Sequence, residues 1–297
     1  MAGWRKKTKG YYKLERLSWS GFNTYRKCGE KYKKRYVDRE EVKDPNYYNT
    51  VGGKTIQGVF ELFYNNEIWR LRGKALPTLM EILPNVYKEV LRETTVNWDH
   101  PDSKLSPREL FNTFPPLIVP ILKLIQKEKL LGKYARSEVK VQAWVDRILL
   151  HGIADFVIRR DDGHMILDGK LTRHRSKYLE KDQLLWYAML YYLQHEKLVD
   201  RMGWIYYTYG ELEWIDFSLE EVKCLYAEVR QAIKDIKKNK FEASPSYDTC
   251  RFCDYKDTCS AHQQMVVAAR HRSAEKNRIK LEESGSPLAG DDSIVSL

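Results

Sequence analysis

The chain has 297 residues, of which 43% are hydrophobic and 31% charged, a composition typical of a folded protein with a sizeable core. At about 150 residues per domain, this length allows one large domain or two small ones. The longest apolar run, residues 186–193, is far shorter than the roughly 20 residues of a membrane span. No apolar run follows the basic first residues, so we expect no secretory signal and a cytoplasmic location.

The positive charge is concentrated at one end of the chain. The net charge is +10, and residues 1–40 hold 13 Lys and Arg against 4 Asp and Glu. Aromatic residues such as Trp19 and Tyr25 lie among these charges. Basic and aromatic side chains together suit a nucleic acid, whose phosphates and bases they can contact. The alternative is a solvated basic leader that only aids solubility.

The first half of the chain has the apolar spacing of helices. Residues 1–13 are expected to form a flexible basic leader, after which Ser18 or Ser20 can cap the first helix. Four helices are predicted, over residues 18–37, 55–70, 78–96 and 107–131.

From residue 135 the pattern changes to the shorter period of strands. Three strands are predicted, over 137–145, 148–158 and 164–171, with a tight turn at 161–163. Later elements are a helix over 178–195, strands over 203–209 and 213–219, and an amphipathic helix over 219–239. A charged helix and a disordered tail are expected over 263–297.

The strand region carries a candidate catalytic group. Asp168 and Lys170 are two apart on one strand and so project to the same side, while the turn brings Asp155 of the neighbouring strand close. Converging carboxylates repel each other unless a cation lies between them, and hard oxygen ligands suit Mg²⁺ or Mn²⁺. The carbonyl of Gly169 could also reach the metal, and Lys170 could activate a water. Asp-Gly-Lys is also common in turns, but the apolar residues before it indicate a buried strand.

Two residues of the next predicted helix could face the same site. Gln183 and Tyr187 are four apart and therefore share one helix face. Both could hold a nucleic-acid backbone or the lysine. Spacing alone favours the simpler interpretation, in which Tyr187 is a core residue and Gln183 a surface residue.

The order of these motifs resembles the PD-(D/E)xK nuclease superfamily, and more closely its RecB-like branch, which includes CRISPR-adaptation-type iron–sulfur exonucleases. The similar segments are Leu17 to Cys28, Gly152-Ile-Ala-Asp155, Asp168-Gly-Lys170 and Gln183-x-x-x-Tyr187. The resemblance implies an α/β (α+β) fold with a central mixed sheet flanked by helices. It spans one domain over 14–262, with a helical part over 14–132, a nuclease core over 135–240 and a cysteine-rich cluster segment over 241–262.

The resemblance also assigns roles to residues. Asp155 and Asp168 would bind the metal, Lys170 would activate water, and Gln183 and Tyr187 would hold the strand and the lysine. The expected DNA-binding residues are Tyr25, Arg26 and Lys27.

Two further positions of this resemblance concern metal binding. Gln57 occupies the position where the family has a metal-binding His, and its carbonyl oxygen is a poorer ligand than imidazole for Mn²⁺. Glu138, at the start of the first strand, matches an acidic position of many relatives. It could bind a second metal or be an exposed carboxylate at the strand end.

The cysteines are a second strong signal. Cys250, Cys253 and Cys259 lie within ten residues, a spacing that usually binds metal in a protein that is not secreted. With His262 they could form a zinc site. The resemblance instead implies that Cys28 is the fourth ligand of a 4Fe–4S cluster, which would link the two ends of the domain.

Together with the residues above, the resemblance implies an Mg²⁺- or Mn²⁺-dependent deoxyribonuclease, an exonuclease acting on single-stranded or free-ended DNA in recombination, repair or phage DNA processing. The location would then be the host cytoplasm if a phage encodes the protein. The chain has no G-x-x-x-x-G-K-S/T loop, so a helicase or recombinase partner could supply a motor. One alternative is a non-catalytic nucleic-acid-binding protein with an inactivated nuclease fold, which Gln57 favours. Another is a zinc-containing RNA-binding protein.

Overall fold

The computed structural model describes residues 12–42, 46–101, 103–172 and 179–283. The chain divides into two compact units. The first, here called the sheet unit, comprises residues 1–23 and 43–240. The second, here called the cysteine unit, comprises residues 24–42 and 241–297. The expected leader lies almost wholly outside the described residues, as does the expected tail from residue 284 onward.

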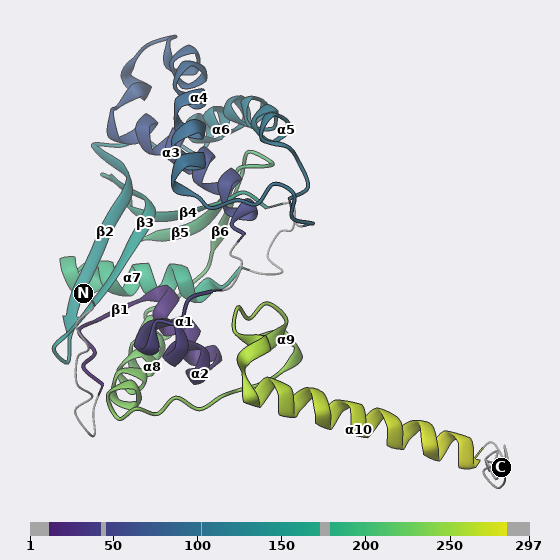
Figure 1. Ribbon diagram of the computed structural model, residues 1–297. Helices are drawn as coiled ribbons and strands as arrows, with labels where there is room; N and C mark the ends of the chain where they lie inside the picture. Colours follow the sequence, from purple (N-terminus) through teal and green to yellow (C-terminus); the bar gives the residue numbers. More distant parts are fainter. Residues whose placement is uncertain (1–11, 43–45, 102, 173–178, 284–297) are drawn as a thin grey trace, which may run out of the picture. The chain divides into compact units, whose positions relative to one another are not determined.

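A six-stranded mixed sheet forms the centre of the sheet unit (Figure 1). Its strands run in the order β1-β3-β4-β5-β6, and β2 pairs with the remaining edge of β3. The β1–β3 and β4–β5 pairs are parallel, whereas the β2–β3, β3–β4 and β5–β6 pairs are antiparallel. The strands are β1 (Arg16–Ser18), β2 (Tyr134–Val145), β3 (Ile148–Arg160), β4 (Gly163–Lys170), β5 (Arg201–Tyr206) and β6 (Glu211–Ile215).

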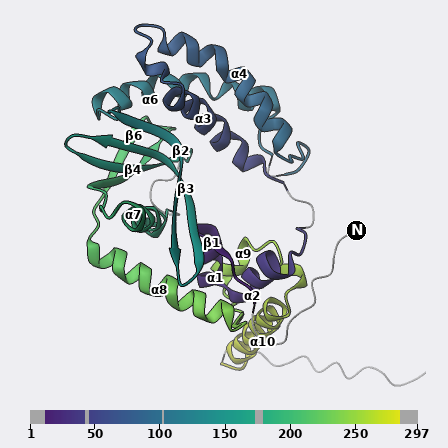
Figure 2. The same ribbon diagram turned by 90° about the vertical axis from the view of Figure 1, so that its left-hand side faces the viewer.

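Helices cover the sheet on both sides, as Figures 1 and 2 show. On one side lie α3 (Tyr48–Asn65), α4 (Ala75–Glu93), α5 (Pro107–Asn112) and α6 (Pro115–Lys127), with the short 3₁₀ helix η2 (Ile68–Arg70). Their apolar residues form one core with Phe156 and Ile158 of β3 and Leu167 of β4. On the other side lie α7 (Lys181–His195) and α8 (Leu219–Lys237). This layered arrangement confirms the predicted fold class.

Helix α7 lies deep in the sheet unit. Its residues from Leu184 to Tyr191 are buried in succession, because the helix packs against both the sheet and α8. Trp186 stacks on Phe22 of α1 (Trp19–Lys27) at a centroid distance of 5.8 Å. Such a helix lacks the polar stripe of a surface helix, and its orientation is fixed by contacts on several sides.

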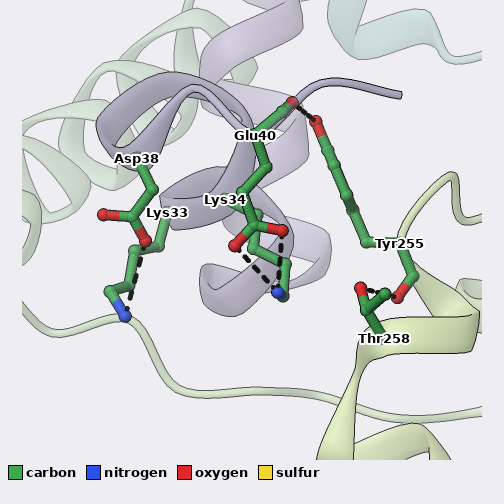
Figure 3. Close-up of polar contacts among 6 residues, drawn as sticks. All are labelled: Lys33, Lys34, Asp38, Glu40, Tyr255 and Thr258. Atoms are coloured by element: carbon green, nitrogen blue, oxygen red, sulfur yellow. Dashed lines mark hydrogen bonds and ion pairs between the residues drawn. The ribbon is translucent and has the colours of Figure 1, made fainter. Parts of the chain in front are cut away.

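The cysteine unit joins an early and a late part of the chain. It contains α2 (Gly29–Tyr32), the π-helical turn η1 (Lys33–Asp38), α9 (Tyr247–Arg251), the 3₁₀ helix η3 (Lys256–Thr258) and α10 (Ser260–Glu283). The Tyr255 hydroxyl donates to the carbonyl of Glu40 at 3.1 Å (Figure 3). The Tyr32 ring stacks on Phe241 at 6.0 Å. A Cβ on Gly29 would lie 2.8 Å from the Glu242 backbone, so only glycine allows this approach.

Two predicted helices are divided in the structure. The helix predicted over 18–37 breaks at Cys28, whose extended backbone separates α1 from α2. The helix predicted over 107–131 ends and restarts before Pro115, because a proline fits the first turn of a helix but interrupts its interior. Strand β1 was not predicted, since its three residues pair only with distant β3. Among the described residues, no helix is long and apolar enough to cross a membrane.

Candidate active site

The two candidate carboxylates lie where β3 and β4 separate. The strands pair as far as Phe156 and Leu167, and the next pair in this register would be Asp155 with Asp168. Like charges directly opposite each other destabilise a strand pair, so the end of pairing here is expected. Asp155 Oδ2 instead accepts a hydrogen bond from the Gly169 N–H at 2.7 Å. The fold thus brings both carboxylates to one point.

Burial makes it energetically costly to ionise both of these carboxylates. Asp168 is 2% exposed. Burial raises the pKa of Asp155 well above its ordinary value, and the charge of Asp168 raises it further. Burial also raises the pKa of Asp168, against the opposing effect of Lys170. Asp168 Oδ2 forms an ion pair with Lys170 Nζ at 2.5 Å and has no further partner among the described residues. A buried oxygen with unused lone pairs beside a second carboxylate fits a hard divalent cation.

Lys170 is held by the helix that follows it. Its Nζ donates to Gln183 Oε1 at 3.2 Å, and Gln183 Nε2 donates to the Tyr187 hydroxyl at 3.2 Å. Tyr187 is itself buried, and its ring fills the space where a Cβ on Gly152 would stand, 2.8 Å away. Tyr187 is therefore both a core residue and a residue of the site, because its buried hydroxyl orients Gln183.

Gln57 lies in the site, and both ends of its amide are engaged. Its Nε2 donates to Glu138 Oε1 at 3.0 Å, and its Oε1 accepts from the Tyr207 hydroxyl at 2.5 Å. Glu138 lies across from Asp155, between the paired residues Ser137 and Val139 of β2, and has a φ of 54°. This left-handed backbone is uncommon for a residue other than glycine and is typical of constrained sites.

Sequence reasoning missed two residues near this amide. Tyr207 is buried beyond the end of β5, and burial raises the pKa of its hydroxyl well above the ordinary value. Its apolar surroundings in the sequence gave no sign of a polar role. Glu61 lies one helical turn after Gln57, and burial raises its pKa, with a further contribution from the Glu138 charge. The spacing of Gln57 and Glu61 on one helix face could have indicated Glu61.

The four candidate cluster ligands line one cavity of the cysteine unit. Cys28, Cys250, Cys253 and Cys259 line this cavity together with His262. His262 Nδ1 lies 3.0 Å from the Lys256 carbonyl oxygen. Within the described ranges, no group of three or more His, Cys, Asp or Glu side chains is arranged to hold a metal ion. Four thiols in one cavity are the ligand type of an iron–sulfur cluster, but in the described residues their side chains do not converge on one point.

The expected DNA-binding residues lie at the end of α1, in the cysteine unit. Arg26 and Lys27 are exposed. The Tyr25 ring packs edge-on against Tyr32 at 5.6 Å and against Phe241 at 6.4 Å. Tyr25 therefore contributes to an aromatic cluster of the cysteine unit.

Comparisons with known proteins identify the family of the chain. The model of the PD-(D/E)XK nuclease superfamily matches residues 16–260. A presumed exonuclease from Eubacterium rectale has a TM-score of 0.48 and 12% identity, over 88% of this chain and 94% of its own. The structure of SSO0001 has a TM-score of 0.33 and 14% identity, over 82% and 96%. Likenesses this distant carry no argument about function. No curated protein matches the chain.

Proposed function

The chain belongs to the PD-(D/E)XK nuclease superfamily, and on this basis we propose that it is a metal-dependent deoxyribonuclease acting from free ends or on single strands. Members of this superfamily typically use divalent metals, and the nuclease fold implies a nucleic-acid substrate. The observation that carries the proposal is the convergence of Asp155, Asp168 and Lys170 at the point where β3 and β4 separate.

Asp155 and Asp168 would hold Mg²⁺ or Mn²⁺, with the carbonyl of Gly169 as a further donor. Mg²⁺ commonly uses one or two carboxylates and completes its shell with waters and substrate phosphates. When bound, the cation supplies positive charge that offsets charge developing on the phosphate and acidifies a water. It would also offset the two effects that raise the pKa of Asp155, which are burial and the charge of Asp168.

Lys170 has two tasks in this proposal. Its ammonium group is aimed by Gln183, which Tyr187 in turn orients, so Nζ is held beside Asp168. From there it can position the attacking water and stabilise the negative charge that develops on the phosphodiester. Gln183 and Tyr187 act through Lys170 and are positioning residues.

We assign Gln57 a positioning role as well. Its oxygen accepts from Tyr207 and its nitrogen donates to Glu138, so its amide already links two residues of the site. Gln57 would thus hold Glu138 opposite Asp155. A second cation on Glu138 is compatible with this arrangement, because the Gln57 amide donates to Oε1 of this carboxylate and not to both oxygens.

For the cysteine unit, we propose a structural 4Fe–4S cluster held by Cys28, Cys250, Cys253 and Cys259. The support is that all four thiols border one cavity. Arg26 and Lys27 directly precede Cys28 in the chain, and we propose that they guide DNA. A RecB-like role in recombination, repair or phage DNA processing follows from the same proposal.

A cleavage assay tests the proposal. End-labelled single- and double-stranded linear DNA would be incubated with anaerobically purified protein in Mn²⁺, Mg²⁺ or EDTA. We expect metal-dependent degradation, reduced by about 100- to 10,000-fold in Lys170→Ala. Lys181→Ala is a matched control, since this lysine pairs with Glu221 on α8. Equal cleavage by wild type and Lys170→Ala would overturn the assignment of Lys170.

The rival is a nucleic-acid-binding protein with an inactivated site. The observation that favours it is the engagement of both ends of Gln57 where relatives have a metal-binding His. It predicts DNA binding without cleavage in any metal. In that case Gln57→His would be the first variant to test for recovered activity.

A further inference from the structure

One face of the β2–β3 hairpin is exposed and carries aromatic and apolar side chains. Figures 1 and 2 show this hairpin extending past β4 and β5. On its inner face, Val141, Val145 and Leu150 are buried. The outer face, here called the hairpin face, consists of Lys140, Gln142 and Trp144 on β2 and Leu149, His151 and Ile153 on β3. Trp144 is 72% exposed and Ile153 is 44% exposed.

The charge around the hairpin face is positive. Lys140 lies on the face itself, Arg147 is exposed at the hairpin tip, and Arg16 of β1 pairs beside Leu149. The acidic residue at the tip, Asp146, is already paired with Arg230 of α8 at 2.9 Å. An exposed indole among cations suits a single-stranded nucleic acid, which offers bases to stack and phosphates to neutralise.

Both strands of the hairpin continue toward the candidate site. On β3, Ile153 lies two residues before Asp155, and on β2, Lys140 lies two residues after Glu138. Trp144 pairs with Leu149, which precedes Asp155 by six residues on β3, roughly 20 Å at about 3.3 Å per residue. This corresponds to about six stacked nucleotides at roughly 3.4 Å each.

We propose that the hairpin face binds the single strand whose phosphodiester is presented to Asp155 and Asp168, with one base stacked on Trp144. This inference rests on the proposed function, because it names the surface along which that substrate lies. Lys140, Arg147 and Arg16 contact phosphates of the same strand. A protein partner is the competing occupant, but the cations and the direction toward the carboxylates favour the nucleic acid.

Binding to a fluorescein-labelled 20-nucleotide oligo-dT in EDTA tests this directly, since no cleavage occurs without metal. Trp144→Ala is expected to weaken binding about tenfold or more, and Trp144→Phe to recover most of it. Tyr209→Ala is the matched control, an aromatic residue 40% exposed in the β5–β6 turn, and should bind as wild type. In wild type, affinity for oligo-dT should rise with length until the oligonucleotide covers the roughly six nucleotides between the carboxylates and Trp144. In Trp144→Ala this rise should be absent.

The outcomes separate this proposal from the proposed function. Cleavage that depends on Lys170 but is unchanged in KM by Trp144→Ala overturns the hairpin face and leaves the nuclease intact. Loss of binding in Trp144→Ala without cleavage by any variant supports the hairpin face and refutes the nuclease. If Trp144→Ala changes the sedimentation of the protein and not its affinity for oligo-dT, the face is a protein interface and the proposal fails.

Discussion

Gly169 shapes the site through the side chain that it lacks. A Cβ at this position would lie 2.0 Å from the Tyr207 hydroxyl oxygen, much closer than any real contact. The same hydroxyl donates to Gln57, and Gln57 donates to Glu138. A glycine between Asp168 and Lys170 therefore allows a tyrosine from beyond β5 to reach a residue of α3, 150 positions away.

Gly169→Ala is expected to destabilise the protein by about 1–3 kcal/mol, because the added methyl group overpacks a buried contact. Tyr207→Leu alone should also destabilise, since it leaves the Gln57 oxygen without its donor. The double variant should lose less stability than the sum of the two single variants, because the leucine removes the group that the methyl meets. Urea unfolding of all four proteins measures this coupling, and strictly additive losses would contradict the contact.

The strands around the site could be predicted because each has a clear local signal. The predicted strands 137–145, 148–158 and 164–171 fall within or close to β2, β3 and β4, and the turn at 161–163 separates β3 from β4 as expected. The placement of Asp155 beside Asp168 followed from that hairpin. The hydrogen bonds of Gln57 could not be predicted, because its partners come from distant elements and carry no motif.

At the level of elements, β3, β4 and α7 meet in a second cluster of ionisable groups. His164 Nδ1 lies 2.8 Å from the Tyr191 hydroxyl, and His195 Nε2 lies 3.3 Å from Arg159 Nη2. Burial lowers the pKa of His164, and the charges of Lys197 and Arg159 lower it further, against the opposing charge of Asp200. Burial and Arg159 also lower the pKa of His195. This cluster therefore favours neutral imidazoles in the folded state.

Protonation of His164 should weaken this junction. Since its pKa is lower in the folded than in the unfolded chain, its contribution is complete above the unfolded pKa of about 6.5 and is lost as pH falls through the folded value. We expect the melting temperature of wild type to drop more between pH 7.5 and 5.5 than that of His164→Gln. Parallel pH profiles of the two proteins would show that His164 does not contribute.

At the scale of the whole molecule, the chain builds one compact unit from segments near its two ends. Residues 24–42 and 241–283 share the Tyr255–Glu40 hydrogen bond and the Lys31–Asp254 ion pair at 3.5 Å. The pKa of the Cys253 thiol is raised by burial. A metal ligand must be a thiolate, so binding of a metal group there would displace the proton that burial keeps on this sulfur. Because the bound group would link residues from both segments, folding of this unit should depend on it.

The identity of that group can be decided by two matched variants. If a 4Fe–4S cluster is bound, the protein should contain about four iron and four sulfide ions per chain, and Cys28→Ser should lose them while His262→Ala keeps them. If zinc is bound by Cys250, Cys253, Cys259 and His262, the losses are reversed. Cys224→Ser, which removes an exposed thiol of α8, should leave the metal content unchanged in either case. Metal and sulfide analysis of anaerobically purified proteins distinguishes these results. Because the candidate nuclease residues lie in the sheet unit, a Cys28→Ser protein that loses iron but still cleaves DNA in a Lys170-dependent way would assign the cluster a structural role.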